Sequence, residues 1–183
     1  MIRPVLFVIG STAIVGLSWR SLGDLYAHGF YRFFAFEFLL ALIVLNSPQW
    51  FRDSLSLRQA ASYSLGVISI GLAVEGFRLL LVIGKPSVTA APKTNLRFEN
   101  TTALVSVGAY RFIRHPLYAS LLALVWCAYL KNPLQITGIL LTIGATGFLI
   151  ATSVAEEREN LARFGPAYED YMKRTRRFVP FLF

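Results

Sequence analysis

The feature that most constrains this chain is a series of five apolar segments that together take up nearly half of its length. They run over residues 5–19, 30–45, 63–83, 117–130 and 134–153. They raise the apolar share of the 183-residue chain to 55%, above the roughly 45–50% of soluble proteins. A soluble domain of this size has too high a surface-to-volume ratio to bury so much apolar surface. The excess predicts contact with lipid.

We therefore expect an all-α integral membrane protein, with about five transmembrane helices and a cytosolic amphipathic C-terminal helix. It forms a single membrane domain over 1–183, with three spans in 1–84 and two spans plus the C-terminal helix in 85–183. Several segments are shorter than the roughly 20 residues that cross a bilayer, so they need extra interfacial turns or are partly re-entrant. The first segment has the length of a signal-peptide core, but no clear small-residue cleavage site follows it, so we expect it to be retained.

Composition excludes several classes of site. The single cysteine, Cys127, excludes an internal disulfide and a multi-cysteine zinc site. Two histidines are too few for a histidine-rich metal cage, so no metal is expected. A net charge of +8 could suggest a nucleic-acid partner, but the positions of the basic residues follow membrane topology instead.

Thirteen of the 18 Lys and Arg residues lie on one side of the five predicted spans. These are Arg20, Arg32, Lys85, Lys93, Arg97, Arg111, Arg114, Arg158, Arg163, Lys173, Arg174, Arg176 and Arg177. The opposite side has Arg3, Arg52, Arg58 and Lys131. Because Lys and Arg are enriched in cytoplasmic loops, we expect a multi-pass protein of the prokaryotic inner (plasma) membrane with its C-terminus in the cytosol. This basic face also contacts anionic lipid of the bilayer.

A polar connection from Lys85 to Thr102, which includes Pro92, leads into a motif-rich run that ends at Tyr118. Pro116 suits the first position of a helix, because it lacks an N–H and its φ is preset. His115 then lies at the N-terminus of this helix, which we call the helix mouth. Free N–H groups and the positive end of the helix dipole favour an anion there. The alternative is a capped helix with interfacial Arg and Tyr side chains and no ligand.

The C-terminal tail carries an amphipathic stripe at three- and four-residue spacing, interrupted by a Gly-Pro pair. Its members are Leu161, Phe164, Tyr168, Tyr171 and Met172. Basic residues on the other side fit a helix that lies on the cytosolic membrane surface. Glu156 and Glu157 directly follow a span, where acidic groups are less expected than Lys or Arg. They therefore indicate a partner, the alternative being a solvated helix end.

Together these motifs resemble the family of isoprenylcysteine carboxyl methyltransferases and phospholipid methyltransferases, which are integral-membrane enzymes. The resemblance covers residues 102–180, and the N-terminal half matches only as generic spans. Its motifs are Thr102–Val105, Gly108–Tyr110, Arg114–Tyr118, Glu156-Glu157, Phe164-Gly165, Tyr168, Tyr171, Arg177 and Pro180.

The resemblance implies a site for S-adenosylmethionine between the Arg-His-Pro helix and the tail, with a lipid-like or amphiphilic acceptor entering from the bilayer. The implied cofactor residues are Thr102, Leu104, Val105, Tyr110, His115, Pro116, Tyr118 and Glu156. The implied catalytic residues are Arg114, Glu157 and Arg177. The implied substrate residues are Thr152, Tyr168 and Tyr171, to which we add Arg78.

The chemistry of the cofactor agrees with these assignments. The Glu156 carboxylate can accept hydrogen bonds from the amino group or ribose, and the helix mouth offers donors to the carboxylate. Thr152 stands where the eukaryotic enzymes place an Arg one turn before the cofactor Glu, which argues against prenylcysteine itself as the acceptor. Two other functions stay open: an NADPH-dependent reductase related to membrane sterol reductases, and a non-catalytic membrane subunit. The oligomeric state is not determined.

Three charged residues lie within the predicted spans: Glu37 in the second, and Glu75 and Arg78 in the third. Ionisable groups in hydrocarbon usually face the bundle interior and have a partner. At about 1.5 Å per residue, antiparallel spans would bring Glu37 level with the other two. One interpretation is a buried ion pair that locks the two spans together. The other is a polar wall of the acceptor pocket, with Arg78 meeting an acidic headgroup.

Overall fold

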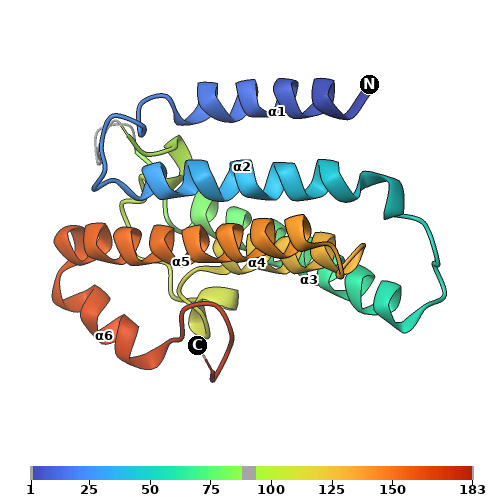
Figure 1. Cartoon of the computed structure of the whole chain (residues 1–183). Helices are drawn as coiled ribbons and strands as arrows, with labels where there is room; N and C mark the ends of the chain where they lie inside the picture. Colours follow the sequence, from blue (N-terminus) through green and yellow to red (C-terminus); the bar gives the residue numbers. More distant parts are fainter. Residues whose placement is uncertain (1, 88–93, 183) are drawn as a thin grey trace.

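The computed structural model describes residues 2–87 and 94–182 (Figure 1), so Pro92 and Lys93 of the polar connection lie outside it. Within these ranges the chain is helical, with a single isolated β-bridge between Ile113 and Arg176. The α-helices are α1 (Ile2–Ser18), α2 (His28–Asn46), α3 (Leu57–Val82), α4 (Pro116–Leu130), α5 (Ile136–Phe164) and α6 (Pro166–Arg174). The 3-10 turns are η1 (Ser47–Gln49), η2 (Arg97–Glu99) and η3 (Gly108–Arg111).

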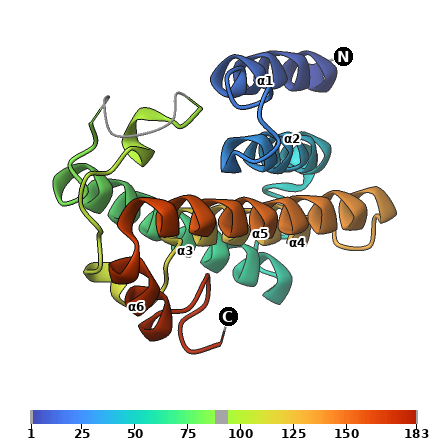
Figure 2. The same cartoon turned by 90° about the vertical axis from the view of Figure 1, so that its left-hand side faces the viewer.

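The helices pack in the order α1, α2, α5, α4, α3, which differs from their order along the chain. Figures 1 and 2 show α1 and α2 on one side of α5, with α3 and α4 on the other. Because consecutive apolar helices alternate in direction, α2 and α4 begin at the end of the bundle where α1, α3 and α5 finish. We call this the site end; it comprises residues 19–27, 83–87, 94–115 and 165–182.

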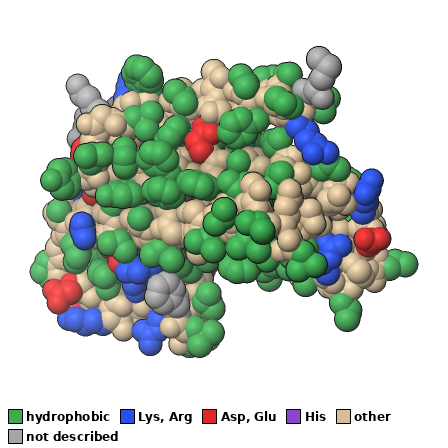
Figure 3. Space-filling model, in the orientation of Figure 1, with side chains coloured by type: hydrophobic (Ala, Val, Ile, Leu, Met, Phe, Trp, Pro, Cys, Tyr) green, Lys and Arg blue, Asp and Glu red, His purple; other side chains and the backbone are tan. Residues whose placement is uncertain are grey.

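The surface of the bundle suits a membrane. In the part of the chain that the structure describes, three helical stretches are long and apolar enough to cross a bilayer: 28–49, 57–82 and 136–164. The helices α1 and α4 are apolar but shorter. Figure 3 shows hydrophobic side chains over the middle of one face, whereas Lys and Arg side chains gather towards its two ends. An all-helical, multi-pass membrane protein fits these observations.

The predicted helix starts are mostly close to those observed, and the helix of the fifth segment continues beyond its apolar stretch. Helix α5 does not stop near Ser153; it continues to Phe164 and carries Glu156 and Glu157 on its last turns. At about 1.5 Å per residue its 29 residues extend about 43 Å, longer than the roughly 30 Å hydrocarbon core. The predicted break occurs at Gly165, whose φ of +55° is a conformation that favours glycine. Helix α6 then begins at Pro166, which confirms the amphipathic C-terminal helix.

The predicted ion pair between the second and third spans was wrong. Helices α4 and α5 lie between α2 and α3, so the two charged stretches do not meet. Glu37 instead accepts a hydrogen bond from Ser11 of α1 (2.9 Å), and Glu75 accepts one from the backbone N–H of Ala109 (3.0 Å). Arg78 is exposed on α3.

Helices α2 and α5 pack tightly at Gly144. A Cβ added at this position would lie 2.6 Å from the nearest ring atom of Phe38, whereas one at Gly147 would meet nothing within 4 Å. The Phe38 ring also stacks on Phe148 of α5, with ring centroids 5.6 Å apart. The absence of a side chain at Gly144 therefore sets how closely the two helices pack.

We expect Gly144→Ala to destabilise the protein by about 1–3 kcal/mol, because the added methyl group overpacks the interface with Phe38. The matched control is Gly147→Ala on the same helix, which should be neutral or slightly stabilising because alanine favours a helix. Thermal unfolding in detergent measures both. Equal melting temperatures for the two variants would contradict the packing shown here.

Candidate active site

A cavity of about 540 Å³ opens at the site end, within the size range of small-molecule sites. Its polar wall combines side chains from the mouth of α4, the end of α5, α6 and the start of α2. These are Arg32, Arg114, His115, Tyr118, Glu156, Asn160, Tyr168 and Tyr171. Its apolar wall comes mainly from α2, α3 and α4: Phe36, Ala73, Val74, Phe77, Leu80, Leu117 and Leu121.

Residues 175–182, which follow α6 and which we call the tail, pair with the Arg-His-Pro segment like a short strand beside the cavity. The N–H groups of Arg114 and His115 donate to the carbonyls of Arg176 (2.7 Å) and Arg177 (3.2 Å). In return the N–H of Arg176 donates to the carbonyl of Phe112 (3.0 Å). Backbone pairing thus places Arg177 beside the mouth of α4. As predicted, Pro116 begins that helix.

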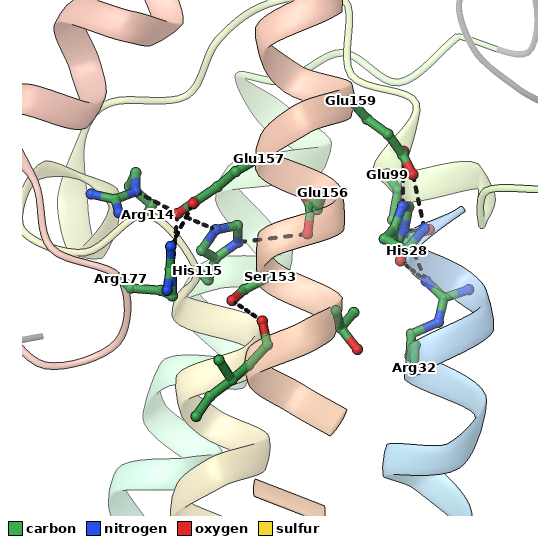
Figure 4. Close-up of polar contacts among 12 residues, drawn as sticks. His28, Arg32, Glu99, Arg114, His115, Ser153, Glu156, Glu157, Glu159 and Arg177 are labelled. Atoms are coloured by element: carbon green, nitrogen blue, oxygen red, sulfur yellow. Dashed lines mark hydrogen bonds and ion pairs between the residues drawn. The ribbon is translucent and has the colours of Figure 1, made fainter. Parts of the chain in front are cut away.

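Glu157 is the centre of this junction (Figure 4). Its Oε1 accepts from Nε of Arg114 (2.8 Å), Nε of Arg177 (3.2 Å) and Nε2 of His115 (3.3 Å). Its Oε2 accepts from Nη2 of Arg177 (2.7 Å). Arg114 also donates to the carbonyl of Thr175 (2.6 Å). Glu157 therefore joins α5, the mouth of α4 and the tail in one network.

His115 lies between the two neighbouring carboxylates of α5 (Figure 4). Its Nδ1 is 3.5 Å from Oε2 of Glu156, and its Nε2 faces Glu157. Burial lowers the pKa of His115, but the carboxylates of Glu156 and Glu157 outweigh it and hold this pKa above the usual value. The ring also stacks on Tyr118, with centroids 5.4 Å apart. A protonated His115 donates from both ring nitrogens and fixes Glu156 at the cavity.

Besides Tyr118, three tyrosines line the cavity: Tyr110, Tyr168 and Tyr171. The Tyr171 hydroxyl donates to the carbonyl of Tyr110 (2.6 Å), which ties α6 to η3. The rings of Tyr168 and Tyr171 lie 5.8 Å apart. Burial raises the pKa of all three phenols above the usual value of about 10. They are therefore neutral and offer aromatic surface and hydroxyl groups to a ligand.

A second charged cluster lies across the cavity, and the sequence analysis missed it. His28, the first residue of α2, contacts Glu159 of α5 through Nδ1 (2.8 Å) and Glu99 of η2 through Nε2 (3.2 Å). Arg32, one turn further along α2, donates to Glu99. Figure 4 shows His28 between the two carboxylates. The available signal is the spacing of four residues between His28 and Arg32 at the start of a span, of which the topology argument uses Arg32 alone.

The structure brings nine of the predicted site residues to the cavity. They are Leu104, Val105, Tyr110, Arg114, His115, Tyr118, Glu156, Tyr168 and Tyr171. The remaining six do not line it: Arg78, Thr102, Pro116, Thr152, Glu157 and Arg177.

Physical reasons account for these six positions. Thr152 is fully buried and donates to the Phe148 carbonyl of its own helix (2.7 Å). Thr102 closes the loop by donating to the Lys85 carbonyl (2.9 Å). Arg78 is exposed on α3 and is not among the residues that line the cavity, so its role as a substrate residue stays a prediction. Pro116 begins α4, and Glu157 and Arg177 bind each other.

Glu157→Gln should destabilise the protein strongly, because it leaves buried cations without their anion. Breaking a buried ion pair from one side costs about 3–5 kcal/mol. The matched control is Glu169→Gln on α6, where a 64% exposed carboxylate meets exposed Lys173, and there the melting temperature should stay unchanged. Thermal unfolding tests both, and equal melting temperatures would refute the role of Glu157 as the centre of the junction.

The raised pKa of His115 predicts a dependence of stability on pH. Its contribution is fully present below the unfolded pKa of about 6.5 and is lost as pH rises through the folded pKa. We expect melting temperature to fall with rising pH above neutrality, and His115→Gln to remove this part of the fall. Direct titration of the ring by NMR of labelled histidine checks the assignment. A His115 that is neutral at pH 6 would contradict it.

Comparison with known proteins adds independent information. The chain is 33% identical over 72 residues to a methanethiol S-methyltransferase of Mycobacterium tuberculosis, covering 39% of this chain and 28% of that protein. It is 33% identical over 75 residues to methanethiol S-methyltransferase 2 of Bradyrhizobium diazoefficiens, covering 40% and 27%. Methanethiol S-methyltransferase 1 of the same organism matches at 33% over 72 residues, covering 39% and 24%. No family model and no solved structure matches the chain.

The matched segment spans less than a third of the length of each relative. All three relatives are named as methyltransferases, the activity that the motifs predicted, and none as a reductase. The resemblance of this chain to the isoprenylcysteine carboxyl methyltransferase-like membrane methyltransferases is therefore confirmed.

Proposed function

We propose that this protein is an S-adenosylmethionine-dependent methyltransferase that acts on a lipid-like or amphiphilic acceptor. The observation that carries the proposal is one cavity with two kinds of wall. A polar wall from α4, α5 and α6 holds Glu156 and His115, and an apolar wall from α2, α3 and α4 faces it. The distribution of basic residues supports a cytosolic position for the site end in a prokaryotic inner membrane.

The residues of the polar wall fit the chemistry of S-adenosylmethionine, which has an α-amino acid group, a ribose and an adenine. Glu156 can accept hydrogen bonds from an ammonium group or from ribose hydroxyls. The Arg114 guanidinium can donate to a carboxylate. The rings of Tyr168 and Tyr171 offer amphipathic aromatic surface to the adenine.

When bound, the donor supplies an electrophilic methyl group on a positively charged sulfur. Transfer is an in-line displacement, so the protein contributes alignment and the exclusion of water. Because a protonated His115 has no lone pair with which to take up a proton, and because its two N–H groups face Glu156 and Glu157, we assign it to holding these two carboxylates in place. Glu157 and Arg177 act through Arg114 and His115, and we assign them positioning rather than catalytic roles.

The apolar wall suits an amphiphilic acceptor, whose reacting group can be a carboxylate, a thiol or an amine. Thr152 is uncharged and its hydroxyl donates within α5, so this position offers no positive charge to a substrate carboxylate. The names of the relatives add a thiol to the candidate acceptors. A carboxylate can attack at neutral pH without losing a proton, whereas a neutral thiol or an ammonium group must lose one first.

Calorimetry with the purified protein separates the candidate functions. We expect saturable binding of S-adenosylmethionine and none of NADPH, and His115→Gln and Glu156→Gln should each weaken binding roughly tenfold or more. Each variant loses a charge-assisted hydrogen bond, which contributes about 1.5–3 kcal/mol. Glu169→Gln on the exposed face of α6 is the control that should bind normally.

Two outcomes would overturn this proposal. Unchanged affinity in both folded variants would remove the site assignment. Binding of neither cofactor by the wild-type protein would favour a non-catalytic membrane subunit. If the donor binds, methyl transfer to amphiphilic carboxylates, thiols and amines then identifies the acceptor group.

A further inference from the structure

Residues 94–105, which we call the strap, form a separate part of the cavity wall. The strap includes η2 and lies between the end of α3 and the start of α2 (Figure 2). Six of its side chains line the cavity: Leu96, Phe98, Glu99, Thr101, Leu104 and Val105. Because α4 and α5 separate α2 from α3, the strap bridges two helices that otherwise do not pack together.

The strap is attached at both ends and in the middle. Ser21, in the connection before α2, donates to the carbonyl of Thr94 (2.7 Å). The ring of Phe98 packs edge-on against Phe77 of α3, with centroids 5.2 Å apart. The N–H of Thr102 donates to the carbonyl of Gly84 (2.8 Å), just beyond α3. These contacts fix the strap mainly to the α3 side.

Attachment to α2 depends on Glu99. Its side chain is 8% exposed and contacts Arg32 and Nε2 of His28. The same carboxylate accepts from the N–H of Leu96 (2.8 Å), so the ion pairs also set the turn of the strap. The Glu99 carbonyl accepts from Arg163 of α5 (3.2 Å). Glu99 thus connects the strap to α2 and α5 at the edge of the cavity.

The charged network of Glu99, His28 and Arg32 positions the strap more than it stabilises the fold. Burial raises the pKa of Glu99, but the hydrogen bond from His28 and the charges of Arg32 and His28 outweigh it and hold this pKa below the usual range. Among the described residues, Nε and Nη2 of buried Arg32 have no hydrogen-bond partner. A buried guanidinium with unpaired donors gives little net stabilisation. The Arg32 guanidinium therefore acts mainly by fixing the position of Glu99 and, through it, of the strap.

We propose that Glu99 is a positioning residue for the methyl donor: it holds the strap against α2 and so encloses the cavity in which the donor binds. This inference rests on the proposed function. Enclosure excludes water from a displacement at a charged sulfur. It also couples donor binding to strap attachment, because the donor binds more tightly when the strap is attached to α2 and therefore favours the attached conformation.

The test compares wild-type protein with Glu99→Gln, and with Glu169→Gln as the matched control. Trypsin cleavage after exposed Arg97 reports release of the strap, and mass spectrometry identifies that cut. In wild type and in the control, S-adenosylmethionine should slow this cleavage. In Glu99→Gln the cut should be fast with or without donor, and donor affinity and KM should worsen by about tenfold, equivalent to about 1.4 kcal/mol.

Glu99→Asp keeps the charge but withdraws it by one methylene, and it serves if the first variant does not fold. It should show the same change to a smaller extent. A merely structural role would lower the melting temperature yet leave donor affinity and donor-dependent protection of the folded variants as in wild type, which would overturn the inference. Failure of the proposed function is distinguishable, because wild type itself would then not bind the donor.

Discussion

The site depends on one buried carboxylate. Glu157 accepts hydrogen bonds from Arg114, His115 and Arg177, which come from the mouth of α4 and the C-terminal tail. Without this anion the three cationic groups would repel one another, and the tail would lose its attachment to α5. The backbone pairing of residues 112–115 with 176–177 aligns these groups. The charge of Glu157 makes their close approach favourable.

Two adjacent glutamates have different roles because an α-helix turns about 100° per residue. Glu157 faces the cations of the tail and is 6% exposed, whereas Glu156 is 24% exposed and lines the cavity. His115 lies between them and links the two environments. The same helical geometry places Glu159 three residues beyond Glu156, where it meets His28 of α2. One face of α5 thereby connects both charged clusters.

The N-terminal half contributes more to the site than generic spans would. Its helix α2 packs directly on α5, which brings His28 and Arg32 to the cavity. The strap connects α3 to α2 through the contacts of Glu99 with His28 and Arg32. The candidate site is therefore assembled from segments that are more than a hundred residues apart in the chain.

The sequence by itself determined the apolar helices, the start of α4 at Pro116, the break at Gly165-Pro166 and the motifs that meet at the cavity. These features follow from local chemistry: hydrophobic runs, the fixed φ of proline and the freedom of glycine. Only the tertiary structure decided that Glu157 is a junction, that Glu37 and Arg78 do not pair, and that His28, Arg32 and Glu99 form a second cluster. The physical reason is that the packing order α1, α2, α5, α4, α3 depends on how whole helix surfaces fit, as at Gly144 and Phe38. Charged partners are neighbours in that packing and not along the chain.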